Sequence, residues 1–208
     1  MTTLKLVVVS AGLSRPSSTR LLADRLARAT GEQLKDVDTE VRVIELRDLA
    51  TAIADHMVTG FPGAGLRDAL DAVAGADGLI AVTPVFTASY SGLFKSFFDL
   101  LDNTALTGKP VLVGATGGTA RHSLVLDHAL RPLFAFLRAR VVPTAVYAAS
   151  EDWGSEGDGH TEHLPGRIDL AGQEMAAEMT GRPAVGRTSD TYDDMVPFAE
   201  QLAALRTG

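Results

Sequence analysis

Short runs of β-branched and other apolar residues alternate along this chain with segments of helical periodicity, and this alternation limits the possible folds more than any other feature. The apolar runs are typical of strands buried on both faces of a sheet, and they span residues 4–10, 41–46, 78–83, 110–116 and 141–148. Helical patterns between and after them span residues 19–29, 66–74, 92–101 and 120–138. The sequence therefore predicts an α/β fold with a parallel sheet, right-handed crossovers and helices on both faces.

The rest of the chain predicts an appendage to this one domain. At 208 residues the chain is too short for two ordinary domains, and its composition of 46% hydrophobic and 22% charged residues is typical of a globular protein. Residues 150–166 are acidic and rich in glycine, which indicates a loop, and helical patterns follow at 167–179 and 190–205. We expect residues 1–150 to form the domain, and residues 151–208, the acidic loop and C-terminal helices, to pack on it.

Composition also excludes several kinds of function. The chain has no cysteine, so disulfides, thiolate metal sites and cysteine nucleophiles are ruled out, and redox chemistry needs a cofactor. No stretch approaches the ~20 apolar residues of a membrane span, and the opening apolar run is too short for a secretory signal. The net charge of −7, without a basic run, argues against a nucleic-acid partner. We expect a cytoplasmic protein with no nucleic-acid or membrane partner.

The loop after the first strand carries an unusual concentration of hydroxyl groups. Ligands of an open parallel sheet bind outside the carboxyl ends of its strands, and the start of a helix exposes N–H groups that attract anions. The predicted site for a compact, dianionic phosphate of a mononucleotide comprises Ser10, Gly12, Arg15, Ser17, Ser18 and Thr19. The alternative is that these hydroxyls only cap the helix, although one suffices for that. The loop lacks G-x-G-x-x-G and a Gly-Lys-Ser/Thr ending, which disfavours dinucleotide and NTPase sites.

The loops after the third and fourth strands suit a flat aromatic ring. Proline stiffens the first of these loops and a phenylalanine gives it an apolar wall, while two glycines let backbone amides of the second approach a planar ligand. The predicted contacts are Pro84, Val85, Phe86, Thr87, Ala88 and Ser89 in one loop, and Thr116, Gly117 and Gly118 in the other. A tight strand-to-helix turn is the alternative explanation for the paired glycines.

Together these loops resemble the flavodoxin-like NAD(P)H-dependent FMN reductases, and most closely the flavin reductase components of two-component alkanesulfonate monooxygenase systems. The resemblance covers residues 4–148. Its most specific stretches are residues 17–19, 83–95, 115–124 and 127–132. It implies that residues 1–150 form a flavodoxin-like, doubly wound FMN-binding domain, with a five-stranded parallel sheet in the order 2-1-3-4-5 and a C-terminal helical extension.

The resemblance also implies where the cofactors bind. The FMN phosphate would contact Ser17, Ser18 and Thr19 with Arg15 nearby, residues 84–89 would border the flavin ring, and residues 116–118 would line its opposite edge. NADPH or NADH would supply a hydride directly to the flavin, so no catalytic acid or base is expected. Reduced flavin would leave for a partner flavin-dependent monooxygenase.

Two departures from the family pattern concern single residues. Phe86 stands where many relatives have tyrosine, and His128 stands where the alkanesulfonate-type reductases insert a tyrosine in a π-bulge of their tetramer interface. We interpret His122 and His128 either as contacts with the flavin or a neighbouring subunit, or as ordinary polar helix positions. They do not share a helix face, so no metal site is expected.

The helical segment 120–138 has two apolar stripes. Leu126, Leu130, Leu133 and Leu137 suffice to cover the sheet, so a second stripe at Leu124, Ala129 and Phe136 suggests burial against another subunit. We expect a homodimer or homotetramer whose active site borrows residues across the interface.

Two other functions fit the same pattern. One is an enzyme that keeps FMN bound and reduces quinones, azo compounds or metal oxyanions. The other is an electron carrier of the flavodoxin type, which the presence of Arg15 and Pro16 in the phosphate loop disfavours. No residue in the sequence marks a clamp for a 2′-phosphate, so NADPH and NADH are not distinguished.

Overall fold

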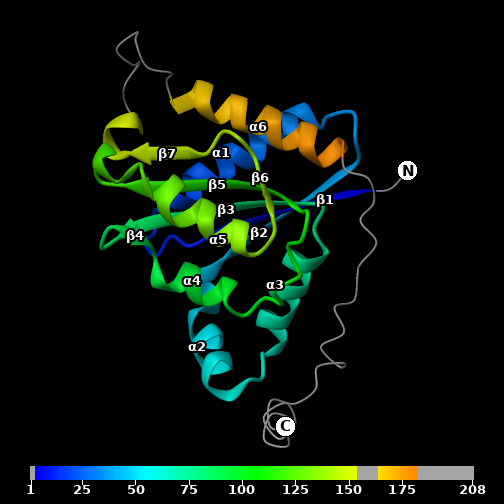
Figure 1. Cartoon of the computed structure of the whole chain (residues 1–208), viewed down its shortest axis with the longest axis vertical. Helices are drawn as coiled ribbons and strands as arrows, with labels where there is room; N and C mark the ends of the chain where they lie inside the picture. Colours follow the sequence, from blue (N-terminus) through cyan, green and yellow to red (C-terminus); the bar gives the residue numbers. More distant parts are fainter. Residues whose placement is uncertain (1–2, 154–163, 182–208) are drawn as a thin grey trace, which may run out of the picture.

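A twisted, mostly parallel sheet lies at the centre of the computed structural model, which describes residues 3–153 and 164–181 (Figure 1). Its strands run in the order β2-β1-β3-β5-β6, with β7 also paired to β5 and the short β4 paired antiparallel to β3. Their bounds are β1 Leu4–Ser10, β2 Thr39–Glu45, β3 Gly78–Phe86, β4 Ser89–Tyr90, β5 Pro110–Gly117, β6 Arg140–Val141 and β7 Val146–Ala149. Since β6 and β7 share the fifth position, the predicted flavodoxin-like order 2-1-3-4-5 is confirmed.

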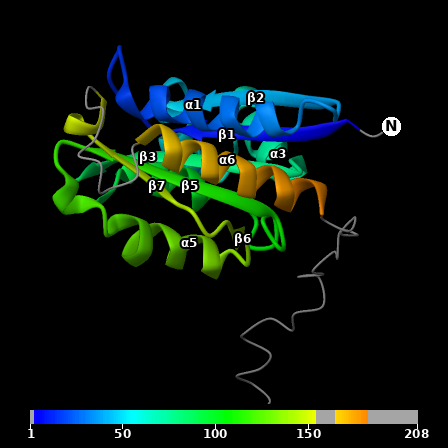
Figure 2. The same cartoon turned by 90° about the horizontal axis from the view of Figure 1, so that it is seen from above.

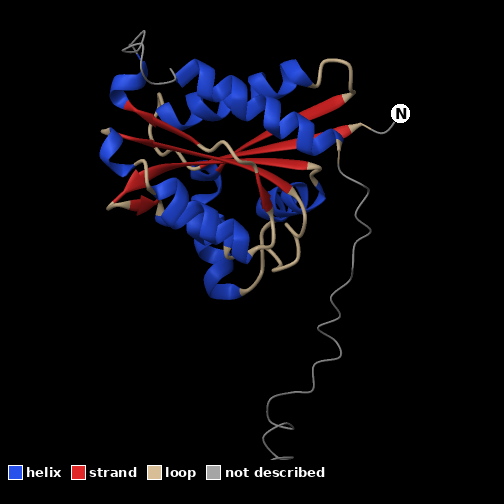
Figure 3. Cartoon of the chain, turned by 45° about the horizontal axis from the view of Figure 1, so that its top comes forward, coloured by secondary structure: helices blue, strands red, loops and turns tan. Residues whose placement is uncertain are grey.

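Helices cover both faces of the sheet (Figures 2 and 3). Helices α1 and α6 lie side by side on one face, and α2, α3, α4 and α5 cover the other. Their bounds are α1 Ser18–Gln33, α2 Ala50–Thr59, α3 Ala64–Gly75, α4 Gly92–Phe98, α5 Arg131–Phe136 and α6 Leu164–Thr180. Among the described residues, no helix combines the length and the apolar character needed to cross a bilayer.

Two hydrophobic cores result from the alternation of side chains along the strands. In β1, Val7 and Val9 face the core under α3, α4 and α5, whereas Leu6 and Val8 face the core under α1 and α6. Strands buried on both faces explain why the sequence shows continuous apolar runs instead of alternation.

An aromatic cluster joins α4 to α5. The rings of Phe94 and Phe98 lie 4.7 Å apart between centroids, and Phe98 meets Phe134 of α5 at 5.0 Å. Phe97 completes the cluster against Phe98 at 5.5 Å. Because α4 follows the β3 loop and α5 follows the β5 loop, this cluster fixes the two loops relative to each other.

The predicted helix at residues 120–138 is wrong as one continuous element. The segment contains a 3-10 turn at Ala120–His122, a π-helical turn at Leu126–Leu130 and then α5. In the π-turn the N–H of Arg131 donates to the carbonyl of Leu126, five residues earlier. Pro132 explains part of the irregularity, because it has no N–H to complete an α-helical bond with the carbonyl four residues before it.

The predicted fifth strand at residues 141–148 is divided between β6 and β7. Pro143 lies in the gap, and proline cannot donate to a sheet ladder. The side chain of Arg131 donates to the carbonyls of Val142 and Pro143 instead, at 3.1 Å to the first.

Three further segments differ from expectation. Helix α2 was not predicted, because only Ile53 of its ten residues is buried and its apolar periodicity is weak. The expected loop at 150–166 begins with a 3-10 turn, η4 at Ser150–Trp153, and ends inside α6. The expected helix at 190–205 lies outside the described residues.

Candidate functional site

A cavity of about 340 Å³ opens at the carboxyl ends of the strands, which lie at the left in Figure 1. It is formed by the loop between β1 and α1, the first turn of α1, the ends of β3 and β5, and the residue after β7. Its lining residues are Leu13, Ser14, Ser17, Ser18, Thr19, Pro84, Val85, Phe86, Thr116, Gly117, Gly118 and Ser150. The three loops singled out in the sequence therefore border one cavity.

Some predicted residues lie beside this cavity instead of lining it. Ser10 and Gly12 are buried, Arg15 is on the surface, Thr87 and Ala88 form a hairpin turn, and Ser89 begins β4. The sequence analysis missed Leu13, Ser14 and Ser150. Ser150 follows a parallel strand directly, so the rule that ligands bind at carboxyl ends could have identified it.

The first turn of α1 presents several hydrogen-bond donors to the cavity. Ser17 is the N-cap residue, and its Oγ accepts from the N–H of Arg20 at 3.2 Å. Its own proton is still available to a ligand. The N–H groups of Ser18 and Thr19 have no acceptor within the helix, because they belong to its first turn. Capping thus uses one hydroxyl and leaves the other donors for an anion.

Thr19 connects two of the loops. Its Oγ1 lies 2.8 Å from Oγ1 of Thr116 in a buried hydrogen bond between the start of α1 and the end of β5. This bond fixes the first turn of α1 against the Gly117-Gly118 turn, so the donors and the glycine backbone keep a constant spacing.

Gly12 lets the loop fold back on α1. A Cβ atom at this position would lie 2.0 Å from Oγ of Ser17. Any side chain on residue 12 would therefore displace the N-cap serine and with it the donors of the first turn.

Arg15 does not point into the cavity. Its side chain is 71% exposed and its guanidinium pairs with Asp48 at 3.0 Å. Arg15 thus lies near the first turn of α1 but is paired with Asp48 instead of lining the cavity, and its contact with a phosphate stays a prediction.

Part of the cavity lining is apolar. Leu13 and Phe86 belong to this part and are about half exposed, although both are large hydrophobic residues. Gly118 borders open space: a Cβ atom built at this position would have no heavy atom within 4 Å. Two exposed apolar side chains and an open glycine are what a planar ring can cover.

Tyr147 of β7 supports the Gly117 turn from behind. Its hydroxyl donates to the carbonyl of Thr119 at 2.8 Å. Burial raises the pKa of this phenol above its ordinary value, and the negative charges of Asp152 and Glu151 raise it further. The hydroxyl therefore keeps its proton at neutral pH and acts as a donor.

A strained turn follows Phe86, which lines the cavity. Thr87 and Ala88 both adopt positive φ angles, 48° and 68°, in the two-residue turn between β3 and β4. Neither residue is glycine, and left-handed backbone is costly for a residue with a Cβ atom. The loop is held at its base by Thr83, whose Oγ1 accepts from the N–H of Ser91 at 3.0 Å.

The two candidate histidines lie on the surface outside this cavity. His122 is in the 3-10 turn and His128 in the π-turn, and both are exposed. Within residues 3–153 and 164–181, no three histidine or carboxylate side chains are grouped so as to hold a metal ion.

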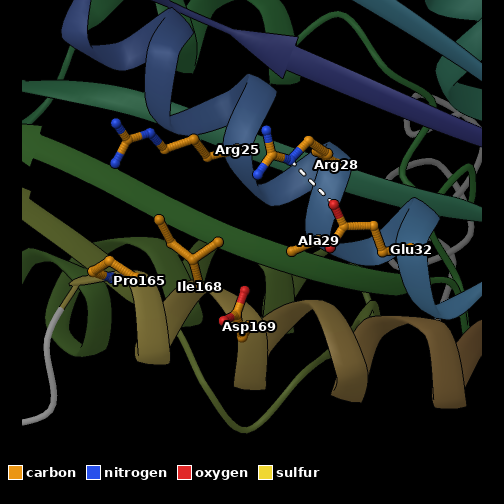
Figure 4. A pocket seen from close by; sticks show the side chains of 7 residues that line it. All are labelled: Arg25, Arg28, Ala29, Glu32, Pro165, Ile168 and Asp169. Atoms are coloured by element: carbon orange, nitrogen blue, oxygen red, sulfur yellow. Dashed lines mark ion pairs between the residues drawn. The ribbon is translucent and has the colours of Figure 1, made fainter.

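A second cavity, of about 280 Å³, lies between α1 and α6 (Figure 4). Its lining includes Arg25, Arg28, Glu32 and Asp169, with Arg28 paired to Glu32 at 3.2 Å. Two cations and two anions offset each other, and none of the predicted site residues lies there, so the cavity at the carboxyl ends is the better candidate.

Comparison with known proteins assigns the chain to one family. Residues 4–154 match the NADPH-dependent FMN reductases. The chain belongs to this family. An FMN reductase (NADPH) of Pseudomonas aeruginosa is 43% identical over 86% of this chain and 94% of its own length. The NADH-dependent FMN reductase SfnF of Pseudomonas fluorescens is 41% identical over 83% of this chain and 90% of its own length.

A solved structure supports the same assignment. An oxidoreductase of Corynebacterium diphtheriae is 44% identical and superimposes with a TM-score of 0.83, over 88% of this chain and all of the other. As a member of the FMN reductase family, the chain is an oxidoreductase that uses a nicotinamide nucleotide to reduce FMN. Family membership thus supports the prediction of an enzyme over the alternative of a flavodoxin-type electron carrier.

Proposed function

We propose that this FMN reductase binds FMN in the cavity at the carboxyl ends of its strands and releases it, once reduced, to a partner flavin-dependent monooxygenase. The observation that carries the proposal is that hydrogen-bond donors for a phosphate and a flat apolar wall for a ring line the same cavity.

The phosphate end of the cavity fits a dianion bound by neutral donors. The hydroxyls of Ser17 and Ser18 and the free N–H groups of the first turn supply hydrogen bonds, and the positive end of the helix dipole adds a favourable field. Among the described residues, no ionisable side chain lines the cavity. Since the chain carries a net charge of −7, local donors have to provide the attraction.

The ring end fits the isoalloxazine. Pro84 and Phe86 offer apolar surface from one side, and Gly117 and Gly118 offer backbone from the other. Phe86 keeps the ring wall that tyrosine forms in many relatives, without its hydroxyl.

In the reduction of FMN, the reacting groups are those of the flavin and the nicotinamide and not side chains of the protein. When bound, the flavin accepts a hydride directly from the nicotinamide. The residues of this chain would then have to hold the two rings in contact, and no catalytic acid or base is needed for the hydride transfer. Since one relative is NADPH-dependent and another NADH-dependent, either nucleotide fits this proposal.

We also propose that the enzyme is a homodimer or homotetramer. Phe136 is 74% exposed and Leu124 is 60% exposed, although both are large apolar residues. They flank the π-turn that carries His128, so this surface, Leu124–His128–Phe136, is the expected contact with another subunit.

The test is nicotinamide oxidation by the purified enzyme with and without added FMN. We expect oxidation that requires FMN, and about tenfold weaker FMN binding in Ser18→Ala from the lost donor. The matched control is Thr51→Ala, which removes an exposed hydroxyl from the first turn of α2. Unchanged FMN binding in Ser18→Ala would contradict the phosphate site, and a yellow protein active only with a quinone would favour the enzyme that keeps its flavin bound.

A further inference from the structure

Arg47 lies outside the cavity but contacts the loop that borders it. It belongs to the 3-10 turn η1, Leu46–Leu49, which follows β2. Its Nη1 donates to the backbone carbonyl of Ser14 at 2.5 Å, across 33 positions of sequence. Ser14 lines the cavity, whereas Arg47 does not. The side chain of Arg47 is only 15% exposed, although the hydrogen bond to Ser14 itself lies at the protein surface.

Acidic side chains hold the Arg47 guanidinium in place. Its Nη2 forms an ion pair with Glu45 at the end of β2, and its Nε lies 3.8 Å from Asp48. The other oxygen of Glu45 accepts from Nη1 of Arg20 at 2.7 Å, in the first turn of α1. The end of β2 therefore fixes both the loop after β1 and the helix start that supplies the donors.

The position of the Ser14 carbonyl matters for an anion. A carbonyl oxygen carries partial negative charge and repels a phosphate, and one that is bonded to Arg47 cannot point into the cavity at the same time. In a trans peptide the next N–H points in the opposite direction, so the contact also fixes the orientation of the N–H of Arg15. Arg47 thus controls whether this peptide presents a repelling or an attracting group.

We propose that Arg47 is a positioning residue that gives the cavity its preference for phosphorylated flavin over riboflavin. The inference rests on the proposed function, in which the flavin phosphate lies at the first turn of α1. Arg47 acts through the backbone of Ser14, because its charge is already neutralised by Glu45.

The test compares two flavins and two arginines of the same region. Arg47→Met removes the guanidinium and keeps apolar bulk. The matched control, Arg42→Met, removes an arginine of β2 whose Nη1 bonds to Asp68 at 3.2 Å, far from the loop. Dissociation constants for FMN and for riboflavin are measured by quenching of flavin fluorescence, together with the thermal midpoint of each variant.

The expected result is a selective loss. Arg47→Met binds FMN about tenfold more weakly, the cost of one hydrogen bond to a charged group, and binds riboflavin within about twofold of wild type. Arg42→Met keeps the wild-type ratio of the two constants. Arg47→Lys retains a cation but has a single nitrogen where the guanidinium uses Nη1 for Ser14 and Nη2 for Glu45, so it recovers only part of the preference.

Two outcomes would overturn the inference and can be told apart. If Arg47→Met weakens both flavins equally and lowers the thermal midpoint, Arg47 supports the fold alone and the proposed function survives. If the wild-type enzyme itself does not prefer FMN to riboflavin, the phosphate site fails, and the role of Arg47 fails with it.

Discussion

A Cβ atom on Gly117 would lie 2.0 Å from the hydroxyl oxygen of Tyr147, a residue of the last strand of the sheet. That hydroxyl in turn donates to the carbonyl of Thr119, so it bridges the two sides of the turn that borders the proposed flavin site. The turn after β5 is therefore shaped by contact with β7 as well as by its own glycines.

We expect Gly117→Ala to lower the free energy of unfolding by about 1–3 kcal/mol, because the new methyl group overlaps the Tyr147 hydroxyl. FMN binding should weaken as well, since the turn must shift. The matched control is Gly118→Ala, whose Cβ meets open space and should leave stability nearly unchanged. Urea unfolding of both variants measures the effect on stability, and FMN titration of Gly117→Ala measures the effect on binding. Equal losses of stability in the two variants would contradict this explanation.

A double variant identifies the atom responsible. Tyr147→Phe alone loses the hydrogen bond to Thr119, at a cost of about 1 kcal/mol. In the Gly117→Ala background the same change should cost less or stabilise, because it removes the overlapping oxygen. A double-mutant cycle measures this coupling, and strictly additive effects would show that another contact opposes the methyl group.

Tyr147 also predicts how stability changes at alkaline pH. Burial, followed by the charges of Asp152 and Glu151, raises the pKa of its phenol above the ordinary value of 10.0. Above that pH the unfolded chain releases the proton before the folded chain does. The contribution of Tyr147 to stability is thus complete below about pH 10 and is lost as the pH rises toward the folded pKa.

Tyr147→Phe serves as the reference for this titration because it cannot ionise. The difference in unfolding free energy between wild type and variant should be constant from about pH 7 to 9 and should shift against the wild type above about pH 10. Urea unfolding at a series of pH values measures it. A difference that stays flat to the highest pH would mean that the phenol is not perturbed.

The strained turn after β3 offers a stabilising substitution. Ala88 has a φ angle of 68°, which glycine adopts without steric cost, so Ala88→Gly should raise the unfolding free energy by about 0.5–1 kcal/mol. The control is Ala135→Gly in α5, where glycine should cost about 1 kcal/mol. Thermal unfolding of the two variants should move in opposite directions, and a lowered midpoint for Ala88→Gly would contradict the strain.

If the Leu124–His128–Phe136 surface is a subunit interface, a negative charge introduced there should disrupt the oligomer. Phe136→Asp should turn a dimer or tetramer into a monomer in sedimentation equilibrium, because a carboxylate cannot be buried in an apolar interface without a partner. Val58→Asp places the same charge on another exposed apolar residue, 88% exposed at the end of α2, and should leave the mass unchanged. A monomeric wild type would refute the proposed interface.

The fold and most of the cavity could be predicted because their signals are local in the sequence. A run such as 4–10 is apolar at nearly every position, and the right-handed crossover then brings the carboxyl ends of the strands to one edge. Loops that follow those strands, such as the one containing Ser17 and Ser18, must meet there. Whether they hold FMN is still a prediction.

What could not be predicted depends on contacts between distant residues. Arg47 meets Ser14 across 33 positions, and nothing in the residues around Arg47 indicates it. The loop at residues 84–89 was predicted, but not the positive φ angles of Thr87 and Ala88, because neither is glycine and the turn is imposed by the pairing of β3 with β4. The break in the predicted helix at 120–138 had a local signal in Pro132, which the apolar stripes outweighed.

Helix α6 places its buried residues, among them Ile168 and Met175, in the core that also contains β1 and α1. Gly172 lies so close to α1 that a Cβ atom there would be 2.7 Å from the backbone carbon of Ala29. A polypeptide shortened to the end of the family match at residue 154 would lack α6. The apolar surface of α1 and the sheet that α6 covers would then be exposed to water, and the protein would tend to aggregate. The smallest recombinant version worth purifying therefore extends through Gly181.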